Sequence, residues 1–95
     1  MAEVKTVYYE PTVKILEYIA KHPSQTMRQI LAGLEGKVSE LEFSMAEDVL
    51  NDCGILNHTW IRDAEKKFHT AYAITPGTNI NQIKKELEKV LPRKK

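Results

Sequence analysis

Two runs of β-branched and aromatic residues, separated by a short charged segment, constrain the fold of this chain most strongly. The first run is ILNHTWIRD at 55–63, and the second is FHTAYAIT at 68–75. Ile, Thr, Trp, Tyr and Phe favour strands. Within the second run, four residues alternate with smaller or polar ones: Phe68, Thr70, Tyr72 and Ile74. The segment DAEKK at 63–67 is typical of an exposed turn, so we predict a β-hairpin with a charged tip.

A helix is predicted between the two prolines of residues 11–23. Its sequence is PTVKILEYIAKHP, in which Pro11 fits the first turn and Pro23 disfavours helix at the preceding residue. Three apolar residues share the predicted buried face: Ile15, Leu16 and Ile19. Upstream, EVKTVYY alternates in a way that favours a short strand or an extended arm within residues 1–10.

Two capping boxes begin the next two helices, Thr26 with Gln29 and Ser39 with Glu42. The apolar residues that follow have helical spacing, which predicts one buried face for each helix. These faces are Met27, Ile30, Leu31 and Leu34 in the first helix, and Phe43, Ala46, Val49, Leu50 and Cys53 in the second. Each helix is expected to stop at a glycine, Gly36 and Gly54 respectively.

A last helix, INQIKKELEKVL at 80–91, is predicted to start after the cap Asn79 and to end at Pro92. Its apolar residues have the 3-4-3 spacing of a coiled-coil seam: Ile80, Ile83, Leu87 and Val90. A helix of this length does not associate stably on its own. The seam must therefore cover the chain's own domain or pair with a second subunit.

This order of elements predicts an α+β fold, mainly α, and it resembles the winged helix-turn-helix domains of the PadR/MarR-like kind. LNDCGIL at 50–56 is similar to the L-x-x-x-G-L-I that ends the third helix of that family. YAITPG at 72–77 is similar to the Y-x-L-T-x-x-G that closes its wing. An amphipathic helix then follows in both, and the resemblance covers residues 10–91.

The resemblance implies three regions and a function. Residues 1–10 would be an arm or strand, 11–77 the winged helix-turn-helix domain, and 78–95 a dimerisation helix with a basic tail. The hairpin would be a wing that rests on the DNA backbone or enters the minor groove. The expected activity is transcription regulation on double-stranded DNA by a homodimer, which would pair through Ile80, Ile83, Leu87 and Val90. The candidate DNA-binding residues are Arg28, Lys37, Ser39, Ser44, Asn51, Arg62, Lys66, Lys67 and His69.

The third predicted helix is acidic, which is unusual for a helix that enters a DNA groove. Residues 39–57 contain five acids and no Lys or Arg, namely Glu40, Glu42, Glu47, Asp48 and Asp52. Glu40 and Glu42 stabilise the helix from its first turn, whereas Glu47 and Asp48 are expected to point outward. Phosphates would repel these acids. An alternative function is therefore a winged helix that docks a basic protein surface, within a transcription or replication assembly, through Glu40, Glu47 and Asp48.

The remaining residues argue against other classes of function. Ninety-five residues suit one domain, and the single cysteine cannot form an internal disulfide, which suits a reducing, cytoplasmic location. No apolar run is long enough to cross a bilayer, so no membrane partner is expected. The spacing of His22, His58, His69 and Cys53 matches no metal motif, and no catalytic or cofactor motif is present. Trp60 is expected to pack in the core, against Tyr72 across the hairpin, rather than to stack on a base.

Overall fold

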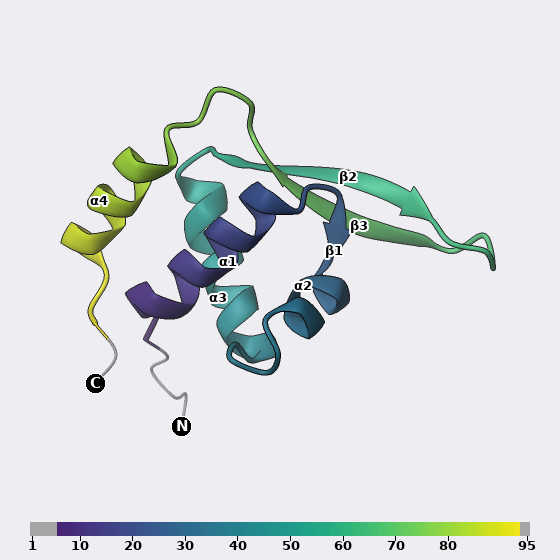
Figure 1. The fold of residues 1–95 in the computed structure, drawn as a ribbon, viewed down its shortest axis with the longest axis horizontal. Helices are drawn as coiled ribbons and strands as arrows, with labels where there is room; N and C mark the ends of the chain where they lie inside the picture. The colour runs from purple at the N-terminus through teal and green to yellow at the C-terminus, as the bar shows by residue number, and fades with distance from the viewer. Residues whose placement is uncertain (1–5, 94–95) are drawn as a thin grey trace.

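The protein is described by a computed structural model over residues 6–93, which holds four helices and a three-stranded antiparallel sheet (Figure 1). In chain order the elements are α1 (Tyr9–Lys21), β1 (Gln25–Thr26), α2 (Met27–Gly33), α3 (Glu40–Asp52), β2 (Leu56–Arg62), β3 (Phe68–Ile74) and α4 (Ile80–Val90). The predicted α+β class and the order of the four helices and the hairpin are therefore confirmed. Among the helices in the described residues, none is long and apolar enough to cross a membrane.

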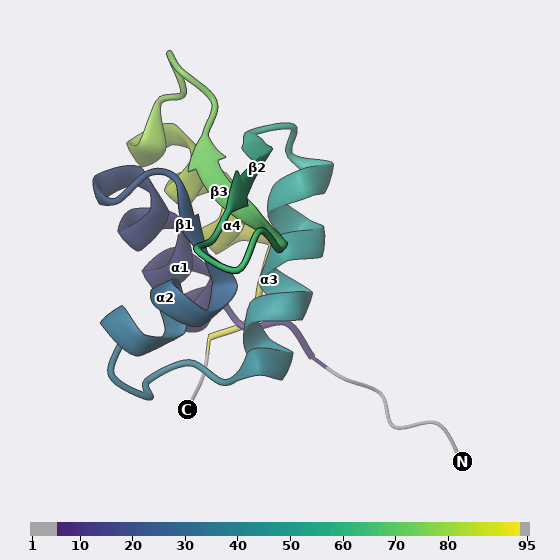
Figure 2. The same cartoon turned by 90° about the vertical axis from the view of Figure 1, so that its right-hand side faces the viewer.

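The sheet has the order β1-β3-β2, and its two long strands form the predicted hairpin. Their register runs from Leu56 opposite Ile74 to Arg62 opposite Phe68, so the tip comprises residues 63–67 as expected. The distal part of the hairpin extends beyond the helices (Figure 1). Figure 2, which views the molecule from the hairpin end, shows α3 on one side of the two long strands and α2 on the other.

One hydrophobic core joins all four helices to the base of the sheet. The predicted faces contribute as expected, since Ile15, Leu16 and Ile19 are buried and Met27, Leu31 and Leu34 pack against the core. Other buried side chains come from α2, α3 and the strands: Ile30, Phe43, Ala46, Leu50, Leu56 and Tyr72. The base of the hairpin is thus fixed by the core, while its distal half is outside it.

The three predicted caps are present and explain where their helices begin. Thr26 and Ser39 each accept from the backbone N–H of the residue three positions on, and the side chains of Gln29 and Glu42 accept from the cap backbones in return. Asn79 accepts from the backbone N–H of Gln82. These hydrogen bonds, reciprocal at Thr26 and Ser39, satisfy N–H groups that have no partner inside a helix.

The ends of the first two helices differ from the prediction. α1 begins at Tyr9, so there is no strand at residues 6–9, and residues 1–5 of the expected arm lie outside the described part. The third strand is instead β1, where Gln25 and Thr26 pair with Tyr72 and Ala71. A strand of two residues has no alternation to detect. α2 ends at Gly33 rather than at Gly36, because the chain turns through left-handed conformations at residues 35 and 36.

α4 packs along α1, on the side of the molecule away from the hairpin (Figure 1). The Lys84 ammonium lies 3.0 Å from the Glu17 carboxylate. The Arg93 guanidinium lies 3.1 Å from the Glu10 carboxylate, 2.8 Å from that of Glu88, and 4.2 Å from the centre of the Tyr9 ring. These contacts hold α4 and the segment after it against the chain's own first helix.

Candidate nucleic-acid interface

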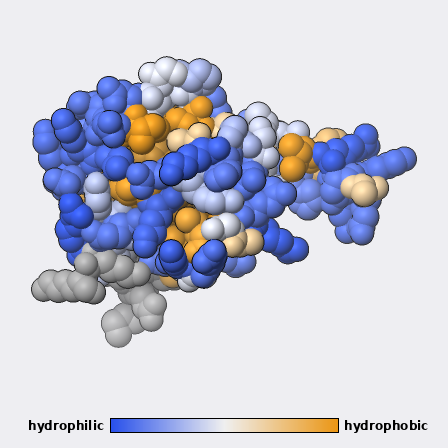
Figure 3. All heavy atoms as spheres, viewed as in Figure 1, coloured by the Kyte–Doolittle hydropathy of each residue, from blue (hydrophilic) through white to orange (hydrophobic). Residues whose placement is uncertain are grey.

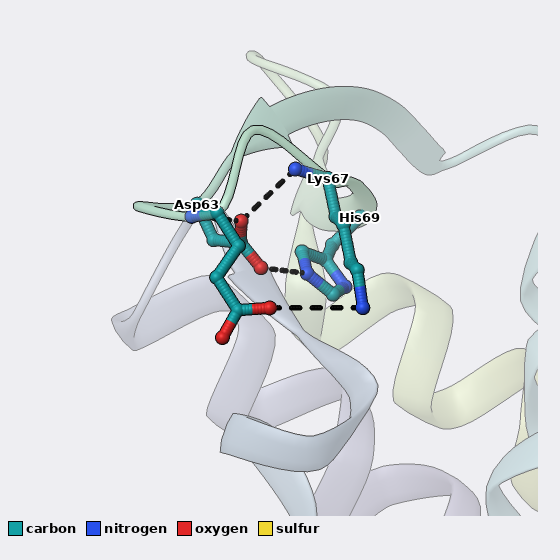
Figure 4. A network of polar contacts seen from close by, with 4 residues as sticks. Asp63, Lys67 and His69 are labelled. Carbon is teal, nitrogen blue, oxygen red and sulfur yellow. Dashed lines mark hydrogen bonds and ion pairs between the residues drawn. The ribbon is translucent and has the colours of Figure 1, made fainter.

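The hairpin tip is a turn organised around one carboxylate. Oδ1 of Asp63 accepts hydrogen bonds from the backbone N–H groups of Glu65 and Lys67, at 2.8 and 3.0 Å. Oδ2 of Asp63 lies 2.7 Å from Nε2 of His69 (Figure 4). The hydrogen bond with His69, followed by that from the Lys67 backbone, lowers the pKa of Asp63. Asp63 therefore stays ionised and holds the turn in shape, and His69 is engaged with it.

Three of the predicted DNA-binding cations project from this turn. Arg62, Lys66 and Lys67 are all exposed. Lys67 lies 3.6 Å from Glu65, but both side chains are largely in water, where such ion pairs contribute little. The visible face of the hairpin is mostly hydrophilic, with a small apolar patch near its middle (Figure 3). The tip therefore presents cations on a hydrogen-bonded turn at some distance from the helices.

The other predicted DNA-binding residues lie on α2, on the turn after it, and on α3. Arg28, on α2, lines an open groove of about 580 Å³ between that helix and the hairpin, together with His69. Lys37 is exposed in the turn before α3. Ser44 and Asn51 are exposed on α3 itself, whereas the hydroxyl of Ser39 is already used as its cap.

The prediction that Glu47 points outward is wrong. Its carboxylate lies 3.3 Å from Nε2 of His58 on β2, and Glu47 also raises the pKa of Tyr72 on β3. Glu47 is only partly exposed, because the sheet packs against this side of α3. The exposed acids of α3 are Glu40, Asp48 and Asp52. Glu47 thus connects α3 to the base of the hairpin.

This contact predicts a pH dependence of stability above pH 10. Burial first, then the hydrogen bond and charge of Glu47, raise the pKa of Tyr72 to about 12, from an ordinary value of 10.0. The unfolded chain loses this proton first as pH rises, so stability falls between about pH 10 and 12. At pH 11 this loss should be about 1 kcal/mol. Urea unfolding at pH 9 and pH 11 should show a smaller decrease in Tyr72→Phe than in the unchanged protein. An equal decrease in both proteins would contradict the assignment.

The predicted packing of Trp60 on Tyr72 is also wrong. Trp60 lies opposite Thr70, and His58 is the residue opposite Tyr72. The Trp60 side chain is 73% exposed and meets the ring of Phe68 edge-on, at 6.2 Å between ring centres. Counting pairs back from the five-residue tip would have given this register and placed Trp60 in the distal half of the hairpin.

Cys53 was expected on the inner face of α3, and it is exposed instead. The helix ends at Asp52, so Cys53 is its C-cap and no longer follows the helical spacing. Residual burial, followed by the charges of Glu86 and Asp52, raises the pKa of the Cys53 thiol. A protonated thiol is a poor nucleophile and a poor metal ligand. Residues 6–93 contain no group of three His, Cys, Asp or Glu side chains that could hold a metal ion.

The predicted dimerisation seam mostly faces its own domain. Leu87 is 1% exposed, and Ile80 and Ile83 pack against the core, whereas Val90 is 72% exposed. Of the two alternatives for this seam, covering the chain's own domain accounts for three of its four residues.

Comparison of this chain with protein-family models, with curated proteins and with solved structures found no match.

Proposed function

We propose that this protein is a winged helix-turn-helix transcription regulator that binds double-stranded DNA mainly through the β2–β3 hairpin. The order of the elements supports the proposal, because three helices followed by a projecting hairpin match the architecture that the sequence resembles. The observation that carries it is the set of exposed cations at the hydrogen-bonded hairpin tip: Arg62, Lys66 and Lys67. Such cations gain affinity for DNA by releasing the counterions condensed on its phosphates.

The negative charge of α3 limits how this protein would contact DNA. Glu40 and Asp48 on the exposed side of α3 are repelled by phosphates, and α3 has no Lys or Arg to offset them. Deep insertion of α3 into a groove is therefore unfavourable. Ser44 and Asn51 can still donate or accept hydrogen bonds at base edges. The hairpin, helped by Arg28 and Lys37, supplies the phosphate contacts that position the protein.

Removing the two lysines of the tip should weaken duplex binding. We expect Lys66→Ala/Lys67→Ala to lower the affinity for any duplex sequence by about tenfold or more, because phosphate contacts carry no base information. Fluorescence anisotropy with a labelled duplex measures this. The matched control is Lys85→Ala/Lys89→Ala, which removes the same charge from exposed positions on α4. Equal duplex affinities of the two double variants would show that the hairpin lysines make no specific contribution to DNA binding.

A second candidate function is docking of a basic protein surface. It is favoured by Leu41, which is 46% exposed on α3, near the exposed acids Glu40 and Asp48. An apolar centre with an acidic border suits a partner of opposite charge. Glu47, the third acid expected there, is engaged with the hairpin base and does not contribute.

Charge reversal on α3 separates the two functions. If DNA is the ligand, Asp48→Lys should tighten nonspecific duplex binding about threefold to tenfold, since a repulsive charge becomes attractive. Glu86→Lys, which makes the same change of charge on α4, should have a smaller effect. If the acids dock a protein, Asp48→Lys should leave duplex binding unchanged and abolish co-purification of that partner from the native cell.

The expected homodimer is a separate part of the proposal. Ile80, Ile83 and Leu87 are already engaged within the domain, so a second copy would need contacts beyond this seam. Binding through the hairpin does not depend on that contact.

A further inference from the structure

The distal hairpin carries two large aromatic side chains that are mostly exposed to solvent. Trp60 is 73% exposed and Phe68 is 58% exposed. The other exposed large apolar side chains of this part of the chain, Leu41 and Val90, lie on different helices. An exposed pair of neighbouring aromatic rings is uncommon on a protein surface and often marks a binding site.

The two rings form one surface with a cation beside it. Because Arg62 is opposite Phe68, and Trp60 lies two residues before Arg62, all three side chains lie on the same face of the hairpin. The rings of Trp60 and Phe68 meet edge-on at 70°. The guanidinium of Arg62 lies 5.2 Å from the centre of the Phe68 ring. Phe68 is thus contacted by both neighbours, while most of the indole remains open to solvent.

The charges around this pair favour a nucleotide as its ligand. Arg62, Lys66 and Lys67 are exposed at the adjoining tip. Of the two acids there, Asp63 is bound to His69 and to two backbone N–H groups. The other, Glu65, lies beside Lys67. Open aromatic rings next to exposed cations match the two parts of a nucleotide, a flat base and a phosphate. Proteins that bind single strands combine these same two features.

We propose that Trp60 and Phe68 form a stacking platform for an unpaired nucleobase, so that the protein prefers DNA with a locally opened strand to fully paired duplex. The inference rests on the proposed function, because the neighbouring phosphates are held by the same hairpin cations. A base inside a duplex is already stacked on both sides and cannot reach the indole. A base in an opened segment can stack on it.

Three DNA ligands of equal length test this platform. One is fully paired, one has a short unpaired bubble in its centre, and one has the same bubble with abasic sites in place of its nucleotides. We expect the bubble to bind about 5- to 150-fold more tightly than the abasic bubble, which is the range for one base stacked on an aromatic side chain. Trp60 is the only tryptophan in the chain. Its fluorescence should therefore be quenched by the bubble and much less by the abasic bubble.

Variants assign the effect to the platform. Trp60→Ala should lose the preference for the bubble over the abasic bubble, measured by anisotropy of labelled DNA, and keep its affinity for the paired duplex. It should also fold, because Trp60 lies outside the core. Val90→Ala removes a side chain of almost equal exposure, 72%, from α4 and should keep the preference.

The outcomes separate this inference from the function on which it rests. Paired duplex bound with no preference for the bubble and no base-dependent quenching would overturn the platform and leave duplex binding intact. Absence of binding to all three ligands would overturn both. Equal preferences in Trp60→Ala and the unchanged protein would also overturn the platform.

Discussion

Replacing Leu87 with alanine should lower the free energy of unfolding by about 2–5 kcal/mol, the range for a buried leucine whose removal leaves a cavity. Leu87 is 1% exposed and belongs to the same core as α1 and α3. Domains of this size are stable by only about 5–15 kcal/mol. The variant should therefore unfold at a temperature lower by about 10–30 °C. Thermal unfolding followed by circular dichroism measures the difference.

Val90→Ala is the matched control, because Val90 belongs to the same apolar stripe and is 72% exposed. Its effect should be within about 0.5 kcal/mol, as for other exposed positions. If Leu87 instead faced a second subunit, the unfolding temperature of the unchanged protein would rise with protein concentration. We expect the same midpoint over a hundredfold range of concentration. A midpoint that rises with concentration, together with a solution mass of twice 10.9 kDa, would restore the seam as a dimer contact.

The elements that sequence predicted well depend on interactions between neighbours in the chain. The capping boxes at Thr26 and Ser39 each join residues three positions apart, so local sequence is enough to place them. The hairpin has a short charged tip between two strand-forming runs, which is enough to place its two strands and its turn. The helical stripe that ends in Leu34 likewise follows from spacing alone.

The features that sequence did not predict depend on contacts between distant segments. Glu47 was expected to point outward from the middle of its helix, but its carboxylate lies 3.3 Å from the ring of His58, eleven residues later. β1 exists only because β3 passes beside Gln25 and Thr26. Trp60 was assigned to the core by its residue type, although an exposed aromatic is compatible with a strand that leaves the core. Such features become visible only when the packing of α3 against the sheet is known.

The acidic α3 and the cationic hairpin would contribute to DNA binding in different ways. Phosphate attraction would come from the tip, and neutral polar groups on α3 would contribute at short range. This differs from a helix that is itself basic, because affinity and base contact would then depend on separate elements. Substitutions at the tip should change affinity on all sequences, whereas substitutions at Ser44 or Asn51 should change preference among sequences.

The dependence of duplex binding on salt tests the central claim most directly. If the three tip cations contact phosphates, the slope of log affinity against log salt concentration should be about −2.7, and about −4.5 if Arg28 and Lys37 contribute as well. Affinity should then fall by roughly 40- to 500-fold between 50 and 200 mM salt. In Lys66→Ala/Lys67→Ala the slope should be shallower by about 2. A duplex affinity that does not change with salt, or a slope that is identical in the double variant, would contradict recognition of DNA by the hairpin.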